Sequence, residues 1–120
     1  NIKKILILKR NLNLIYKEEF SNKTTYSILE EPIYSRSNYW INIVDLKTLN
    51  KKKNFLKTLL KNNIEARPVW KCNHLQKPYI DCETYKIDEA LKIENNYLCL
   101  PSSYFLKKKK IKKILQYFKK

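Results

Sequence analysis

Residues 65–79 read "EARPVWKCNHLQKPY", and they concentrate the least common side chains of a 120-residue chain. The segment holds the only histidine, His74, together with an arginine, a tryptophan and a cysteine, while the whole chain contains no glycine. Residues 64–70 predict a strand, and Pro68 indicates that this strand ends there or lies at the edge of a sheet. A loop that carries His74 follows it.

The sequence before this segment predicts two helices that enclose two strands. Residues 1–22 have apolar side chains at spacings typical of one helical face, without an N-cap residue or an initial methionine, so we expect the tail of a longer protein. Strands are expected around residues 26–29 and over residues 39–46, where β-branched and aromatic side chains are frequent. Residues 49–62 predict an amphipathic helix, with lysines on one side, that is closed by Asn62 and Asn63.

The sequence after the His74 loop predicts a helix, a strand and a final helix. Residues 83–95 carry a weak helical pattern, and "YLCLP" at residues 97–101 is a short apolar strand. The tail, residues 107–120, places four apolar side chains on one helical face: Ile111, Ile114, Leu115 and Phe118. Such a basic helix can bind a membrane or partner surface or can pack on a sheet, and the narrow apolar stripe favours packing.

The predicted order of elements indicates a single α+β domain over residues 1–120. Few strands between amphipathic helices predict a short, mainly antiparallel sheet of three or four strands that is covered by helices. The length allows one modest core and is too small for two domains. No low-complexity linker divides the chain, and no apolar run approaches the length of a membrane-spanning helix.

The net charge of +15 is compatible with a small basic module that binds nucleic acid or an anionic membrane. The lysines are spread over nearly every segment, however, and abundant Lys, Asn and Ile are typical of an AT-rich genome. We therefore keep the basic module as the alternative function and expect neither nucleic acid nor a membrane as a partner. The absence of glycine argues against a P-loop, a dinucleotide fingerprint and a glycine-rich cup for a cofactor phosphate.

The three cysteines, Cys72, Cys82 and Cys99, contain no CxxC pair and are odd in number. Without a secretory signal they predict reduced thiols in a cytoplasmic protein, and Cys99 in its apolar strand predicts a small core residue. Together with His74 the thiols could supply four zinc ligands. Structural zinc usually takes its ligands in close pairs, which these residues do not form, so we expect no metal site.

Two ordered motifs give the chain a family resemblance. "NNIEARPVWKCNHLQKPY" at residues 62–79 and "LCLPSS" at residues 98–103, with "SNYW" upstream and "CETY" between them, resemble the C-terminal domain of the DegT/StrS family of pyridoxal-phosphate-dependent sugar-nucleotide aminotransferases. The similarity is strongest to the branch that makes 4-amino sugars, such as bacillosamine-type or legionaminic-type precursors. The matching positions are Arg67, Pro68, Trp70, Lys71, His74, Leu75, Gln76, Leu98, Cys99, Leu100, Pro101 and Ser102.

The resemblance covers essentially all 120 residues and implies the aspartate-aminotransferase (fold type I) architecture. It implies a homodimer that moves an amino group, usually from glutamate, to a nucleotide-linked keto sugar, for surface polysaccharide or glycan biosynthesis. Residues 1–22 would be a linking helix and residues 23–120 the small domain. Pyridoxal 5'-phosphate and its Schiff-base lysine would belong to a large domain that precedes residue 1, so we expect this chain to be inactive alone and assign no catalytic residue to it.

By the same resemblance, the residues that this domain contributes are substrate contacts. His74 is expected near the sugar, where an imidazole can bond a hydroxyl group or the diphosphate. Arg67 is expected to pair with an anionic group, either the carboxylate of the donor or the nucleotide phosphate. Trp70 is expected to pack on the sugar ring, and Gln76 to fix an amide or hydroxyl group.

Each of these assignments has a structural alternative. The imidazole of His74 can satisfy a backbone carbonyl, Arg67 can form an ion pair with Glu65 or Asp81, and Trp70 can belong to the core. Residue types alone favour these alternatives, because an indole is usually buried for packing. The resemblance favours function for His74.

The chain also departs from the family pattern. Cys72 and Asn73 replace the Pro-Met that precedes the histidine, and two glycines around "LCLPSS" are replaced, one within residues 95–97 and one by Ser103. If these positions require positive φ, each substitution costs roughly 1 kcal/mol. Four lysines, residues 107–110, oppose the positive end of the last helix dipole. We therefore predict a partial or degenerating gene product.

Overall fold

The computed structural model describes residues 1–119 and is built on a four-stranded antiparallel sheet. Its strands, in the spatial order β1-β2-β4-β3, are Ser27–Ile28 (β1), Asn42–Asp45 (β2), Tyr97–Leu100 (β4) and Arg67–Pro68 (β3). The longest pairing joins β2 to β4, and it places Asn42 opposite Leu100 and Asp45 opposite Tyr97. The predicted α+β class and antiparallel sheet are confirmed.

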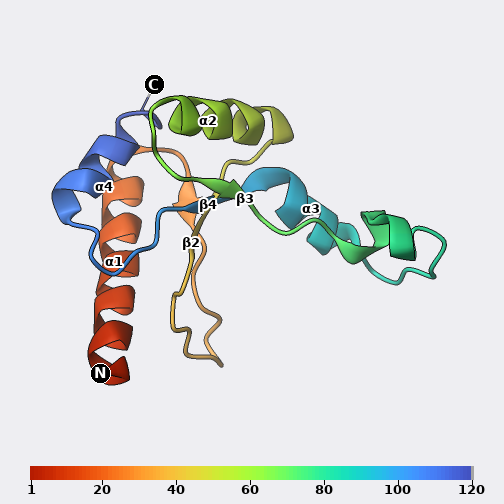
Figure 1. Ribbon diagram of the computed structural model, residues 1–120, viewed down its shortest axis with the longest axis horizontal. Coiled ribbons are helices and arrows are strands. Elements are labelled where there is room, and N and C mark those ends of the chain that lie inside the picture. The colour runs from red at the N-terminus through yellow and green to blue at the C-terminus, as the bar shows by residue number, and fades with distance from the viewer. Residues whose placement is uncertain (120) are drawn as a thin grey trace.

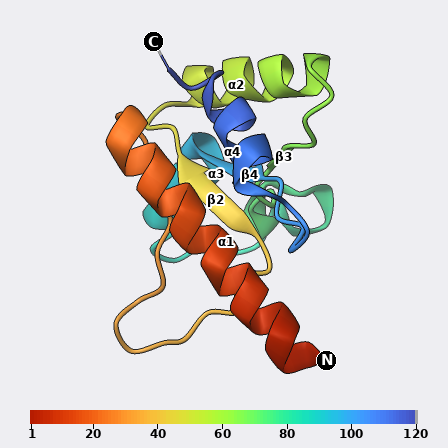
Figure 2. The same ribbon diagram turned by 90° about the vertical axis from the view of Figure 1, so that its left-hand side faces the viewer.

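Three helices share one core with one face of this sheet: α1 (Ile2–Lys23), α2 (Leu49–Lys61) and α4 (Lys108–Leu115). Figures 1 and 2 show them around the strands, with α1 and α4 side by side. Along the strands, Val44, Leu98 and Leu100 belong to the core cluster, whereas Ile43 and Cys99 alternate to the opposite face. The helices therefore leave the second face of the sheet without a matching layer.

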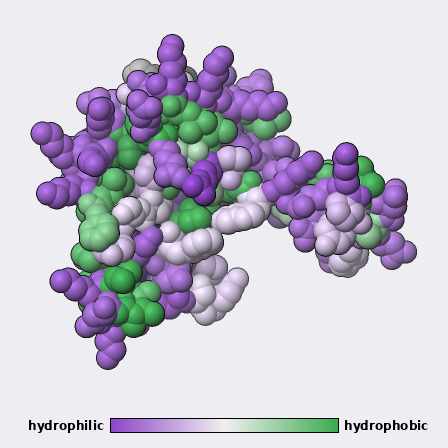
Figure 3. All heavy atoms as spheres, in the orientation of Figure 1, coloured by the Kyte–Doolittle hydropathy of each residue, from purple (hydrophilic) through white to green (hydrophobic). Residues whose placement is uncertain are grey.

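The C-terminal half of α1 is the part of that helix that packs. Leu12, Tyr16 and Phe20, four residues apart, are buried, and the Tyr16 hydroxyl donates a hydrogen bond to the Pro101 carbonyl (2.9 Å). Ile2 and Ile7, in the N-terminal half, are exposed, and Figure 3 shows green apolar surface at this free end of the helix, at the lower left. The start of α1 therefore carries apolar surface that the rest of the described chain leaves uncovered.

The ends of α2 follow the expected capping chemistry. The Thr48 side chain accepts a hydrogen bond from the Lys51 N–H at the start of the helix. At its end Asn63 adopts φ 56°, and the Ile64 N–H bonds to the Leu59 carbonyl (2.9 Å), which is the hydrogen bond of a Schellman motif. The predicted closure by Asn62 and Asn63 is confirmed.

The last helix packs on the body of the protein as predicted. Ile111, Ile114 and Leu115 are buried, and the ring of Phe118 lies edge-on to that of Phe20 with centroids 5.1 Å apart. No helix within residues 1–119 is both long enough and apolar enough to cross a bilayer.

Two features on which the prediction of a degenerating product depends look different in the structure. None of residues 95–97 and Ser103 has positive φ, so the expected strain at the replaced glycines is absent there. Near the start of α4, the Lys108 ammonium lies 3.3 Å from a Glu18 carboxylate oxygen and 3.6 Å from one of Glu19. One of the four lysines is therefore compensated by α1.

Several elements are shorter than the sequence predicts. Strand β3 has two residues instead of seven, because the chain leaves the sheet after Pro68, which has no N–H to donate. Helix α3 (Asp88–Asn96) begins five residues later than the expected 83–95 helix, and α4 ends at Leu115 instead of residue 120. Lys120, the last residue of the expected domain and helix, lies outside the described residues.

Residues 70–96 form an arm that projects from the rest of the molecule (Figure 1). It contains two short 3-10 helices, Asn73–Leu75 (η1) and Lys77–Tyr79 (η2), followed by α3. All 27 of these residues are described, and none is buried. We call residues 1–69 and 97–119 the body.

Candidate functional site

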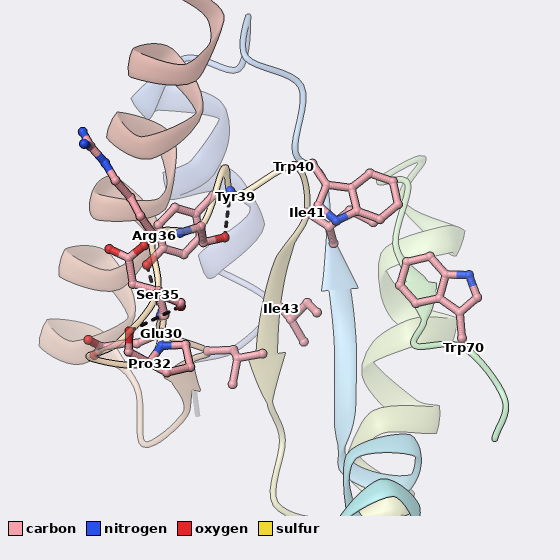
Figure 4. A pocket seen from close by; sticks show the side chains of 12 residues that line it. Glu30, Pro32, Ser35, Arg36, Tyr39, Trp40, Ile41, Ile43 and Trp70 are labelled. Carbon is pink, nitrogen blue, oxygen red and sulfur yellow. Dashed lines mark hydrogen bonds between the residues drawn. The ribbon is translucent and has the colours of Figure 1, made fainter. Parts of the chain in front are cut away.

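A groove of about 450 Å³ lies beside the face of the sheet that the core helices leave uncovered. Trp40 and Trp70 stand at one end of it, with Ile43 in the middle and Tyr39, Glu30 and Pro32 toward the other end (Figure 4). The two indoles stack with centroids 5.8 Å apart and an interplanar angle of 26°, although Trp40 is 61% and Trp70 65% exposed. We call this the tryptophan groove.

Trp70 therefore does not belong to the core, which rules out its structural alternative. An exposed, nearly parallel pair of indoles presents a flat apolar surface with N–H donors at its edges. Such a surface suits the apolar face of a sugar ring or a nucleobase. The partner, Trp40, was missed as a site residue by sequence reasoning, and its only signal was its place in the "SNYW" motif.

The segment before Trp40 is held against α1 by a group that we call the clasp: Arg10, Glu31 and Tyr39. The guanidinium of Arg10 donates to both carboxylate oxygens of Glu31, at 2.5 and 3.1 Å, and lies 5.4 Å from the centre of the Tyr39 ring. The Tyr39 hydroxyl in turn accepts a hydrogen bond from the Glu31 N–H (3.2 Å). The hydrogen bond from Arg10 is the main reason why the pKa of Glu31 lies below its ordinary value.

The "LCLPSS" motif fixes the other side of Trp40. The Ser102 hydroxyl accepts a hydrogen bond from the Asn42 N–H (2.7 Å) and donates one to the Leu100 carbonyl (2.8 Å). The Lys9 ammonium donates to the carbonyls of Trp40 (2.9 Å) and Ser102. The "SNYW" and "LCLPSS" motifs thus meet where the tryptophan groove begins. The "LCLPSS" motif has a structural role there.

Arg67 lies on the same open face, in a smaller hollow of about 190 Å³. It pairs across the sheet with Cys99, and its exposed guanidinium forms an ion pair with Glu65, as one of its alternatives predicted. This exposed pair contributes little to stability, so Arg67 can exchange Glu65 for another anion. Ile41 lines both this hollow and the tryptophan groove, which makes them neighbours.

Cys99 is buried as expected, but it lies outside the core cluster, on the face of Arg67. Burial raises the pKa of its thiol.

His74 and Gln76 lie on the arm and line neither of these hollows. The His74 Nε2 atom is buried without a hydrogen-bond partner in the described chain, so the alternative in which that atom bonds a carbonyl is not observed. The Gln76 amide donates to the Lys71 carbonyl (3.1 Å) and to Asn73 Oδ1 (3.2 Å). The structure therefore brings Arg67 near Trp70 and places the other two predicted site residues elsewhere.

Glu94 of α3 contacts both the start of the arm and the body. Its Oε2 atom accepts a hydrogen bond from the Cys72 N–H (2.8 Å), and its backbone carbonyl accepts one from the buried Lys52 ammonium of α2. The Glu94 carboxylate, more than partial burial, raises the pKa of the Cys72 thiol. Burial would raise the pKa of Glu94 itself, but hydrogen bonds from Cys72 and the charges of Lys52 and Lys71 hold it below its ordinary value.

Residues 1–119 do not form a pyridoxal phosphate site of their own. Burial lowers the pKa of Lys9 and Lys52, as a Schiff-base lysine requires, but both ammonium groups are bonded to backbone carbonyls and neither lines the tryptophan groove or the Arg67 hollow. The chain also has no glycine for a phosphate cup. Within residues 1–119, no three His, Cys, Asp or Glu side chains cluster as metal ligands.

Residues 1–119 match the sequence profile of the DegT/DnrJ/EryC1/StrS aminotransferase family. Among curated proteins, no relative matches the sequence.

Solved aminotransferases share the fold. DesI, solved with its TDP-sugar product, superposes with a TM-score of 0.83 at 13% identity, over 96% of this chain and 30% of its own. PseC of Helicobacter pylori, an aminotransferase of pseudoaminic acid biosynthesis, gives 0.78 at 19%, over 94% and 32%. Spr1654 of Streptococcus pneumoniae, assigned as a sugar aminotransferase and solved in its PLP form, gives 0.80 at 18%, over 95% and 30%. The chain thus spans about a third of each.

Proposed function

The chain belongs to the DegT/DnrJ/EryC1/StrS aminotransferase family, and we propose that it is the small C-terminal domain of a sugar-nucleotide aminotransferase. The observation that carries this proposal is the match of residues 1–119 to the family profile. The fold supports it, because the chain corresponds to about a third of solved aminotransferases of the same architecture.

The proposed reaction is the transfer of an amino group from glutamate to a keto sugar linked to a nucleotide. The substrate belongs to the 4-amino-sugar branch, and the product serves surface polysaccharide or glycan biosynthesis in the cytoplasm. Pyridoxal 5'-phosphate supplies the electron sink for this chemistry. Since the residues of this chain do not fit the cofactor, it is held by a separate large domain, and the chain alone does not transaminate.

The open face of the sheet supplies substrate contacts in this proposal. The stacked Trp40 and Trp70 hold a ring of the nucleotide sugar, and Arg67 releases Glu65 to bind an anionic group of the nucleotide or of glutamate. His74 and Gln76 act from the arm, where they reach substrate in a homodimer or against the large domain. The buried and unpaired Nε2 of His74 supports a partner for this atom that the chain itself does not provide.

A kinetic experiment on the longest product of the gene that encodes this chain tests the proposal. Glutamate-dependent amination of a nucleotide-linked 4-keto sugar is followed by mass spectrometry, and bound pyridoxal phosphate by visible absorbance. Trp70→Ala, Arg67→Gln and His74→Ala are expected to raise KM more than they lower kcat, with unchanged cofactor absorbance. Tyr85→Ala, which removes an exposed aromatic ring outside the groove, is the matched control.

A product without cofactor absorbance and without amination would overturn the proposal. The alternative of a basic module would then predict binding to DNA or anionic vesicles that weakens steeply with salt.

A further inference from the structure

A second hollow of about 450 Å³ lies away from the tryptophan groove, between the end of α2 and α4. Figure 1 shows the chain leaving α2 and turning down beside α4. The apolar part of its lining consists of Ile64, Pro101, Leu106 and Ile114. Its volume is within the range of sites for small molecules.

The polar part of the lining carries a net positive charge, with two lysines, two asparagines and one glutamate. Lys110 and Lys113, one helical turn apart on α4, line the hollow together with Asn63. Glu65 also lines it, but that carboxylate already forms its ion pair with Arg67. Neither Lys110 nor Lys113 forms an ion pair with another residue in the described part of the chain.

The residues around the hollow add to the positive charge of its lining. Six of the seven residues from Lys107 to Lys113 are lysines, and only Lys108 is paired with the carboxylates of α1. The N-terminal end of α4, which has no side-chain cap, contributes the positive end of its dipole. A concave site in such a field attracts anions, and a dianion relieves the repulsion between the lysines most effectively.

We propose that this hollow binds a small organic phosphate, with the phosphate between Lys110 and Lys113 and an apolar body against Ile64 and Leu106. A phosphate fits better than a carboxylate because it carries close to two negative charges at neutral pH and offers three acceptor oxygens. The apolar lining selects a phosphate ester over inorganic phosphate. The hollow includes neither Arg67 nor either tryptophan, but it shares Glu65 and Pro101 with the hollow of Arg67.

The test uses the full 120-residue chain and phenyl phosphate as the probe, at constant ionic strength so that screening does not change during the titration. Amide chemical shifts in an NMR titration are expected to saturate and to concentrate at residues 62–65 and 106–114. Phenyl phosphate is expected to bind more tightly than inorganic phosphate. Thermal unfolding is expected to shift upward as the probe concentration rises.

Matched double variants separate a site from diffuse charge. The double variant Lys110→Gln with Lys113→Gln is expected to weaken the binding of phenyl phosphate roughly tenfold. Lys109→Gln with Lys112→Gln removes the same charge from the same helix outside the hollow, and it is expected to leave binding nearly unchanged. All four lysines are exposed, so both variants should fold, which far-UV circular dichroism verifies.

Equal weakening in both double variants would overturn the proposal in favour of nonspecific attraction. Equal affinity for phenyl phosphate and inorganic phosphate would remove the role of the apolar lining, and shifts that never saturate would exclude a site. Each of these results leaves the kinetic test of the proposed function unaffected.

Discussion

The body and the arm are held by different interactions, although both carry many exposed lysines. In the body, one cluster of buried side chains joins three helices to one face of the sheet, with Tyr16, Phe20 and Leu98 fully enclosed. In the arm, all of whose residues are described, no residue as a whole is buried. The backbone carbonyls of Glu94 and Asn96 accept hydrogen bonds from Lys52 and Leu46 of the body, and the Glu94 carboxylate accepts one from the Cys72 N–H within the arm. The body therefore takes its shape from hydrophobic packing among its own residues, whereas the arm takes its shape from a few polar contacts.

The largest expected effect comes from the core of the body. Leu98→Ala removes a fully buried side chain from the central strand β4 and leaves a cavity, so we expect the free energy of unfolding to fall by about 2–5 kcal/mol. Chemical denaturation measures this change. Ile80→Ala in the arm deletes the same number of side-chain atoms from a residue that is 64% exposed, and it should change stability by less than about 0.5 kcal/mol. Similar losses in both variants would mean that the arm has a core of its own.

The sequence predicts the body well because the patterns that form its core are local. The apolar spacing of α1, α2 and α4 and the β-branched strands each act locally, so the order of elements and the antiparallel sheet could be inferred before the structure. Even the Schellman end of α2 follows from two consecutive asparagines.

The site was less predictable, because its contacts join residues far apart in the chain. Arg10 meets Glu31 and Trp40 meets Trp70, at separations of 21 and 30 residues that no local pattern reveals. In a chain with 26 basic residues, nothing in the sequence distinguishes Arg10 from its neighbours. The length of β3 was overestimated because the apolar content of 64–70 does not show where the chain turns away into the arm.

A smaller effect is expected where α1 is bonded to the sheet. Tyr16→Phe keeps the ring but removes the hydrogen bond to the Pro101 carbonyl, so it should cost about 1–2 kcal/mol of unfolding free energy. Burial raises the pKa of the Tyr16 phenol, so the wild-type chain should lose stability as pH rises above the ordinary tyrosine value of about 10. The variant should lose less over this range. Tyr85→Phe, at an exposed tyrosine of the arm, should show neither effect.

A variant of the clasp tests a part of the body that lies outside the core. Arg10→Gln should leave the core intact but free the segment before Trp40, so amides of residues 31–39 should exchange hydrogen faster than those of β4. The pKa of Glu31 is lowered, so its contribution is complete above the ordinary glutamate value of about 4.3 and is lost as pH falls through the folded pKa. Acid below this ordinary glutamate value should therefore mimic the variant, whereas milder acid should not. Uniform exchange over the whole chain would contradict a local role.

The smallest expected effect concerns the contact between Glu94 and Cys72 within the arm. Glu94→Gln removes the charge that raises the pKa of the Cys72 thiol, so the thiolate fraction at pH 8 should increase and alkylation by iodoacetamide should be a few-fold faster. Mass spectrometry of the alkylated peptides compares Cys72 with the exposed Cys82 as an internal reference. Glu89→Gln, an exposed position on the same helix, is the matched control. If Cys72 reacts at the wild-type rate while the amides of residues 71–79 also keep their protection, the Glu94 side chain does not hold residues 71–79 against α3, and the shape of this segment comes from its own backbone turns.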